Sequence, residues 1–106
     1  MKAHSIANKQ ASTYVARRSL FKGSNLFSEM RGNAYVVYSY GYHFPLIVHV
    51  GGKWYENSDR YSASTSRHLH HCKPTGLGME KATTGELKAL IDKALMPASE
   101  AQAVAP

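Results

Sequence analysis

Apolar residues recur along the middle of the chain in short runs that predict β-strands. Four runs are rich in Val, Leu, Ile and aromatic residues, which favour strands: residues 25–31, 34–40, 43–50 and 53–56. They are separated by pairs that suit two-residue hairpin turns: Gly32-Asn33, Gly41-Tyr42 and Gly51-Gly52. The pattern therefore predicts an antiparallel meander of three or four strands.

The turns also predict the register of these strands. Three pairs are expected across the Gly51-Gly52 turn: Val50 with Lys53, His49 with Trp54 and Val48 with Tyr55. Three more are expected across the Gly41-Tyr42 turn: Tyr40 with His43, Tyr38 with Pro45 and Val36 with Ile47. Because Pro45 has no N–H to donate, its place in a doubly paired strand indicates a bulge or a longer loop.

Side chains alternate between the two faces of a strand, so this register predicts one core face and one half-wet face. The core face would collect Tyr35, Val37, Phe44, Leu46, Val48, Val50 and Tyr55. The half-wet face would collect Val36, Tyr38, Tyr40, His43, Ile47, His49 and Trp54. A slip of one residue would exchange the two faces.

Helical spacing on both sides of the meander predicts two helices. Residues 12–21 carry apolar side chains at near-helical intervals behind Ser12, a good cap. Thr83 and Glu86 have the spacing of a capping box, ahead of an apolar stripe that ends before Pro97. We therefore expect an α+β fold, in which an N-terminal and a C-terminal helix pack on one face of a small antiparallel three- to four-stranded β-meander. The single globular domain would span residues 12–96, between a flexible N-terminal arm (residues 1–11) and a disordered tail (residues 97–106).

The charge of the chain is positive and unevenly distributed. Thirteen Lys and Arg face seven Asp and Glu in 106 residues, a net charge of +6. Residues 1–79 hold ten of the basic and three of the acidic residues, a balance of +7. Such a domain attracts polyanions or acidic protein surfaces; the alternative is ordinary charge for solubility.

The sequence also limits the cellular setting. Cys72 is the one cysteine, which excludes an intramolecular disulfide. Residues 1–10 lack the apolar run of a signal peptide, and no segment approaches the roughly 18 apolar residues needed to span a bilayer. We expect no membrane association and a cytoplasmic location, in a bacterium or in a cell that hosts a virus.

Hydroxyl and basic residues gather in residues 60–68. The hydroxyls are Ser62, Ser64, Thr65 and Ser66, and the guanidiniums are Arg60 and Arg67. Both groups donate hydrogen bonds to anionic oxygens, so the segment is a candidate cradle for phosphate or carboxylate. The alternative is that the hydroxyls cap turns in the neighbouring backbone.

A metal site and a catalytic site are both disfavoured by the sequence. His68, His70, His71 and Cys72 are potential zinc ligands, but neither a CxxC nor an HExxH motif is present. Carboxylates are scarce in the centre of the chain, and no phosphate-binding glycine motif occurs. We therefore predict no metal, no cofactor and no catalytic residue, and keep a small hydrolase or nuclease with His43 or His68 as base as the third hypothesis.

The aromatic face suggests a platform for single-stranded nucleic acid, where rings stack on bases and cations follow phosphates. The stacking residues would be Tyr40, His43 and Trp54. The phosphate-neutralising residues would be Lys53, Arg60, Arg67 and Lys73. The alternative is that Tyr38, Tyr40 and Trp54 pack beneath the C-terminal helix.

Three stretches of the chain carry a resemblance: residues 35–45 (YVVYSYGYHFP), 54–62 (WYENSDRYS) and 65–68 (TSRH). They resemble a group of small uncharacterised proteins of bacteriophages, other viruses and mobile elements, with the pattern YVVYSYGxHFP followed by WYxNxDxYSxTTSxH. The resemblance covers about residues 24–74, and departs from the pattern at Ser64, where Thr is more usual, and at residues 69–71. It implies an accessory role, such as modulating host nucleic-acid processing or defence.

Together these features favour a non-enzymatic protein that binds nucleic acid through a basic surface rich in Tyr, Trp and His. The second hypothesis is a protein inhibitor of a host defence or nucleic-acid-processing factor, which would contact an acidic host protein. A homodimer is compatible with either.

Overall fold

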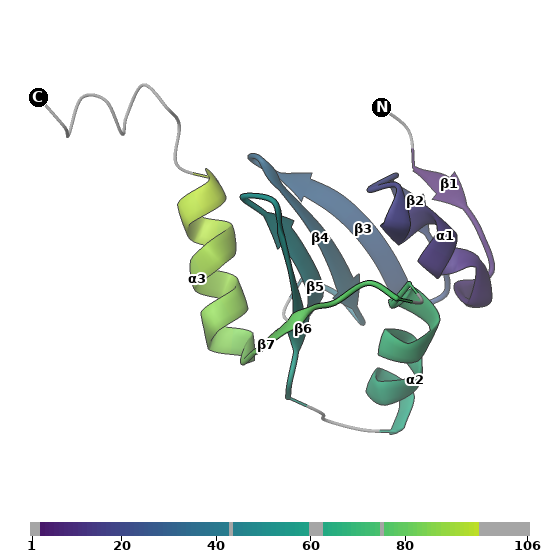
Figure 1. Cartoon of the computed structure of the whole chain (residues 1–106). Helices are drawn as coiled ribbons and strands as arrows, with labels where there is room; N and C mark the ends of the chain where they lie inside the picture. The colour runs from purple at the N-terminus through teal and green to yellow at the C-terminus, as the bar shows by residue number, and fades with distance from the viewer. Residues whose placement is uncertain (1–2, 43, 60–62, 75, 96–106) are drawn as a thin grey trace, which may run out of the picture.

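The computed structural model of the chain describes residues 3–42, 44–59, 63–74 and 76–95, with the backbone alone for residues 63–66. The described strands form one sheet of seven, ordered as in the sequence (Figure 1). They are β1 (His4–Ser5), β2 (Phe21–Lys22), β3 (Leu26–Arg31), β4 (Ala34–Ser39), β5 (Pro45–Val50), β6 (Lys53–Asn57) and β7 (Glu80–Ala82). The outer pairs β1–β2 and β6–β7 are parallel, and the pairs between them are antiparallel.

Helices cover both faces of this sheet (Figure 1). The described helical segments are the 3-10 turn η1 (Asn8–Gln10), α1 (Ala11–Ala16), α2 (Ala63–Cys72) and α3 (Thr84–Leu95). Ala11 and Val15 of α1 and Leu69 and Cys72 of α2 are buried in one core cluster with Phe21. Leu87 and Ile91 of α3 belong to a second cluster on the opposite face, so the molecule has three layers.

The expected three- or four-stranded meander with both helices on one face is therefore wrong, although the broad α+β class holds. The sheet of the described residues has seven strands and is mixed, and α1 and α3 lie on opposite faces. Strands β1, β2 and β7 have two or three residues each, too few to show an apolar alternation in the sequence. Phe21, expected at the end of the first helix, lies in β2 instead.

Residues at both ends of the chain were expected to lie outside the domain. Within the arm expected over residues 1–11, β1 pairs with β2, and Ala11 is fully buried. The tail expected over residues 97–106 lies outside the described residues. No helix of the described part is long and apolar enough to cross a membrane.

Two of the predicted hairpins are confirmed. Across the Gly51-Gly52 turn, Val50 pairs with Lys53 and His49 with Trp54. Across the Gly32-Asn33 turn, the flanking residues of β3 and β4 pair with one another. The predicted capping box is confirmed as well, because Thr83 N–H donates to Glu86 Oε1 (2.8 Å) and Glu86 N–H donates to Thr83 Oγ1 (3.2 Å).

A β-bulge decides which side chains share a face. Tyr38 lies opposite Pro45 as predicted, but the register shifts between Val37 and Tyr38, so that Val37 pairs with Ile47 and Leu46 is the extra residue. The predicted pairing of Val36 with Ile47 is wrong, and so are the predicted faces beyond the bulge. The expected partner of Tyr40, His43, lies outside the described residues.

Neither face of the central strand β4 is open to water. Tyr35, Val37 and Ile47 pack under α1 and α2, and Trp54 packs against the same cluster. Val36, Tyr38 and Val48 pack under α3. The expected half-wet aromatic face is therefore divided between two cores.

Gly32 allows the β3–β4 turn to pack closely against the end of α3. Gly32 has φ +60°, and a Cβ built there would lie 1.9 Å from the carbonyl oxygen of Ala94. Gly51 has nearly the same φ, +61°, but nothing within 4 Å of a built Cβ. The two positions thus share the backbone strain of a positive φ and differ in the space around them.

Gly32→Ala should therefore destabilise the protein more than Gly51→Ala. We expect Gly51→Ala to cost about 1 kcal/mol from the positive φ alone. Gly32→Ala should cost about 1–3 kcal/mol more, because α3 must move off the turn. Urea unfolding of the two variants measures the difference, and equal free energies of unfolding would contradict the close packing of α3 on the turn.

Candidate functional site

Residues 63–72, within a polar stretch for which the sequence predicted no regular element, form the helix α2. In α2, His68, Leu69 and Cys72 are buried while Arg67 and His70 are exposed. The helix therefore owes its place to one side that packs on the sheet rather than to an apolar stripe visible in the sequence. Burial raises the pKa of the Cys72 thiol, so Cys72 is a neutral core residue.

Helix α2 also separates the histidines that were considered as metal ligands. If these residues formed a strand, His68, His70 and Cys72 would share a face. In the helix, His68 and Cys72 are buried, whereas His70 is exposed and points away from them. Among the described residues, no group of three His, Cys, Asp or Glu side chains could hold a metal ion.

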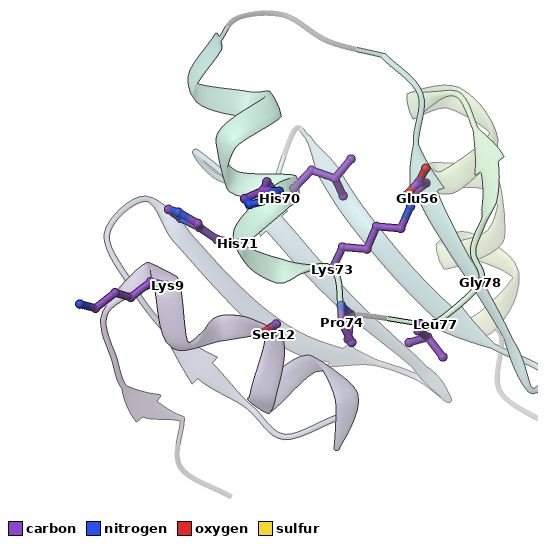
Figure 2. A pocket seen from close by; sticks show the side chains of 11 residues that line it. Lys9, Ser12, Glu56, His70, His71, Lys73, Pro74, Leu77 and Gly78 are labelled. Atoms are coloured by element: carbon purple, nitrogen blue, oxygen red, sulfur yellow. Dashed lines mark ion pairs between the residues drawn. The ribbon is translucent and has the colours of Figure 1, made fainter.

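The C-terminal end of α2 forms one wall of an open pocket of about 800 Å³ (Figure 2). Lys9 and Ser12 approach it from η1 and α1, and Glu56 from β6. His70, His71 and Lys73 come from the end of α2 and the residue after it, and the loop after Lys73 adds Pro74, Gly76, Leu77 and Gly78. Leu69 of α2 lines it as well, so segments far apart in the sequence meet in one hollow of mixed polar and apolar character.

An ion pair between the buried Glu56 and the exposed Lys73 lies on one side of this pocket. Glu56 is 3% exposed near the C-terminal end of β6, and Lys73 Nζ lies 2.8 Å from its Oε2 atom. In Figure 2 the Lys73 side chain runs from the end of α2 to this carboxylate. A buried carboxylate is costly unless it is paired, so the pair fixes the end of α2 to the sheet.

Two histidines continue the polar wall. His70 is exposed at the rim, whereas His71 is partly buried and its Nδ1 atom has no hydrogen-bond partner among the described residues. Their rings lie 6.2 Å apart between centroids. An imidazole carries at least one N–H in any protonation state, so both rings can donate to an anion.

Comparison with known proteins assigns no function to this site. No protein-family model, curated protein or solved structure matches this chain. The resemblance to small phage and mobile-element proteins therefore stays a prediction.

The surface around the pocket carries almost no negative charge. No Asp or Glu occurs in residues 1–28 or in residues 60–79, and these are the segments that form α1, η1 and α2. The cations of this layer in the described residues are exposed and comprise Lys9, Arg17, Arg18, Arg67 and Lys73. Because η1 and α1 both contact α2, these charges gather on one face of the molecule, which we call the cationic face.

The structure does not assemble the predicted aromatic platform. Trp54 packs edge-on against Tyr35, with 6.3 Å between ring centroids, and against His49 at 4.6 Å. Tyr40 follows the other end of β4, five residues beyond Tyr35, which at about 3.3 Å per residue places it roughly 16 Å away. The two stacking residues therefore lie toward opposite ends of the sheet, and His43 lies outside the described residues.

The predicted phosphate contacts are divided in the same way. Lys53 forms an exposed pair with Glu80 (3.7 Å) and lines a hollow beside Leu90 and Lys93 of α3, away from α2. Lys73 and Arg67 lie on the cationic face. Arg60 and Ser62 lie outside the described residues, and for Ser64, Thr65 and Ser66 the structure gives only their place in the first turn of α2.

A buried serine–histidine pair bears on the hydrolase hypothesis. Ser39 Oγ lies 2.7 Å from His68 Nδ1, and the exposed Tyr40 ring covers His68 with 5.1 Å between centroids. This is the spacing of a nucleophile and its base, but Ser39 is only 1% exposed. The pair accordingly ties α2 to the end of β4, out of reach of a substrate.

The sequence did not identify Lys9, Ser12 or Glu56 as site residues. It also did not place His70 and His71 in a pocket with them. Lys9 and Ser12 lie about 60 residues before His70 in the chain, so no local motif joins them. The signal that could have found this face is the absence of acidic residues from two separate segments.

Removing the partner of the buried carboxylate should destabilise the fold. Lys73→Met leaves Glu56 buried without its counter-charge, and we expect a loss of about 1–3 kcal/mol in the free energy of unfolding. Adding Glu56→Gln should restore much of this loss. The matched control is Lys53→Met in the exposed Lys53–Glu80 pair, expected to change stability by about 0.5 kcal/mol or less. Equal losses for Lys73→Met and Lys53→Met in urea unfolding would contradict the assigned burial.

Acidification should destabilise the protein through His68. Burial first, and then nearby His71 and Arg67, lower the pKa of His68 from its ordinary value of 6.5. The unfolded chain then binds the proton more readily than the folded protein, so stability is full at higher pH and is lost as the pH falls below about 6.5.

Urea midpoints measured between about pH 7.5 and about pH 5.5 check this dependence. The midpoint should fall on acidification in the native protein and fall less in His68→Gln, whose amide can still bond Ser39. His49, whose pKa is also lowered by burial and by Arg18, accounts for part of the remaining fall. An identical fall in the variant would show that His68 does not carry the effect.

Proposed function

We propose that this chain is a small, non-enzymatic protein that binds nucleic acid through the cationic face. The observation that carries the proposal is the meeting of two segments without acidic residues in one layer. The acidic side chain lining the pocket in this layer is Glu56, which is buried and paired with Lys73. A face of exposed Lys and Arg with so little opposing charge attracts a polyanion.

The opposite layer supports this choice of face. Helix α3 carries Lys88 and Lys93 beside Glu86 and Asp92, and Glu80 of β7 pairs with Lys53. Mixed charges of this kind largely cancel at a distance, so they attract a polyanion weakly. The positive charge of the chain is thus concentrated on the α1–α2 side, where it can follow a phosphate backbone.

Contacts from arginine and lysine to phosphates position a protein on nucleic acid without reading its sequence. In the proposal, Arg17 and Arg67 are the outer contacts, and Lys9 the contact nearest the pocket. Trp54 is assigned no stacking role, because it packs against the core. The phage or mobile-element origin implied by the sequence resemblance fits such an accessory role, and remains part of the proposal.

A second candidate function is supported by a different surface. Tyr42 is 53% exposed, and the Arg31 guanidinium lies 4.7 Å from the centroid of its ring. Phe27 and Tyr38 pack against Tyr42 at 5.2 Å and 5.1 Å between centroids. Tyr and Arg are enriched in the residues that dominate protein interfaces, so this cluster favours a protein inhibitor that contacts a host factor.

Neutralising the cationic face should weaken binding and flatten its salt dependence. For Arg17→Gln and Arg67→Gln, each lost phosphate contact should reduce the slope of log K against log salt by about 0.7–0.9. The matched controls are Lys88→Gln and Lys93→Gln on α3, which remove the same charge from the opposite layer and should leave the slope unchanged.

Fluorescence anisotropy with labelled single-stranded and duplex DNA and RNA, at several salt concentrations, measures these slopes. Equal losses in the two pairs of variants would contradict the assignment to the cationic face. Absence of binding, together with capture by a host protein that depends on Tyr42, would favour the second candidate.

A further inference from the structure

The pocket beneath the end of α2 differs from the surface around it. The cationic face presents single cations on convex helices, whereas the pocket is a hollow of about 800 Å³ bounded by η1, α1, α2, β6 and the loop after Lys73 (Figure 2). Its volume lies within the range of about 300–1,000 Å³ typical of small-molecule sites, which is large enough for one nucleotide. A phosphate backbone lying across the face would not need such a hollow.

Hydrogen-bond donors line this hollow from several elements. Lys9 and Ser12 lie on one side, with the Lys9 ammonium directed outward at the rim, and His70 and His71 lie on another (Figure 2). The His71 Nδ1 atom is buried without a partner among the described residues, so a bound acceptor would meet it only after the ring rotates toward the pocket. Ammonium, hydroxyl and imidazole groups together suit the oxygens of a phosphate.

The buried carboxylate does not oppose an anion here. Glu56 is neutralised by Lys73 at 2.8 Å, and an ammonium has three donors. The contact with Glu56 is an ion pair, and Glu56 Oε2 has no hydrogen-bond partner among the described residues, so the Lys73 donors remain available to an acceptor in the pocket. Glu56 therefore acts as a support that holds the Lys73 ammonium at the inner wall.

The loop after Lys73 contributes two glycines to the pocket lining, Gly76 and Gly78, where no side chain covers the main chain. A Cβ built at Gly76 or Gly78 would meet nothing within 4 Å, so both glycines face open space. Glycine lets a ligand approach the main chain closely, and main-chain N–H groups favour anions. Gly76 has φ +79° and requires glycine for its conformation, whereas Gly78 has no such constraint and can be substituted.

From this arrangement we propose that the pocket binds a phosphomonoester, the terminal phosphate of a nucleic-acid chain or of a free nucleotide. A phosphomonoester carries nearly two negative charges, where an internal phosphodiester carries one. It also ends in three free oxygens, enough to meet donors from several walls at once. For a nucleic-acid end the inference rests on the proposed function, because the chain would leave the pocket across the cationic face.

The test compares oligonucleotides that differ only in a terminal phosphate. A single-stranded DNA labelled at the 3′ end is titrated with a 5′-phosphate and with a 5′-hydroxyl, and a 5′-labelled DNA with and without a 3′-phosphate. We expect one phosphorylated end to bind about tenfold more tightly, as for one or two added charge-assisted hydrogen bonds. Inorganic phosphate and a nucleoside monophosphate, used as competitors, distinguish the two sources of the ligand.

Two pocket variants and one matched control test whether any gain in affinity from the terminal phosphate arises in the pocket. His70→Gln with His71→Gln removes the imidazoles, and Gly78→Val fills the bare loop while leaving the histidines in place. Both should abolish the gain from the terminal phosphate. His4→Gln changes an exposed histidine on β1, outside the pocket, and should preserve the gain. Urea unfolding verifies that each variant is folded, and Gly78→Val keeps the test decisive if the double variant is not.

The outcomes separate this inference from the proposed function. Equal affinity for phosphorylated and unphosphorylated ends, without competition by either small phosphate, overturns the inference and leaves the cationic face intact. Failure of all oligonucleotides to bind, with a nucleoside monophosphate that binds and is lost in Gly78→Val, overturns the proposed function and supports the pocket. A gain that persists in both pocket variants overturns the inference as well.

Discussion

Strand β4 has all six of its residues buried, and this burial determines how the rest of the molecule is arranged. Tyr35 and Val37 belong to the core under α1 and α2, while Val36 and Tyr38 belong to the core under α3. A strand buried on both faces needs a helical layer on each side, because an uncovered face would leave large apolar side chains in water. Helix α2 therefore forms from a polar segment, and its position creates the pocket beside Glu56.

The same layering separates charge. The segments that cover one face, residues 1–28 and 60–79, contain no Asp or Glu, whereas α3 on the other face carries both signs. Charges spread along the sequence would nearly average out over a surface, but here the fold collects cations in one layer. The pair of Lys73 with the buried Glu56, at the edge of that layer, holds the end of α2 to the sheet, so fold stability and the shape of the candidate site depend on one contact.

The sequence predicts those features that short-range chemistry determines. The Gly51-Gly52 hairpin and the Thr83–Glu86 capping box follow from adjacent residues, and both are confirmed. The bulge at Leu46, the two- and three-residue strands and α2 depend on contacts between distant segments, so local pattern could not give them. For the same reason the predicted site is only partly assembled. Arg67 and Lys73 lie on the cationic face, while Trp54 packs against the core beneath it and Lys53 lies on the α3 side. The pocket residues were not found.

The measurement that tests the central claim most directly is a residue-resolved binding map. Backbone amide chemical shifts of the ¹⁵N-labelled protein would be followed by NMR during titration with a short single-stranded oligonucleotide. The proposed function predicts that the shifts that move cluster in η1, α1, the second half of α2 and residues 73–78, with α3 unaffected. Shifts that cluster instead around Arg31, Tyr42 and the end of α3 would contradict the claim that the α1–α2 layer is the binding face.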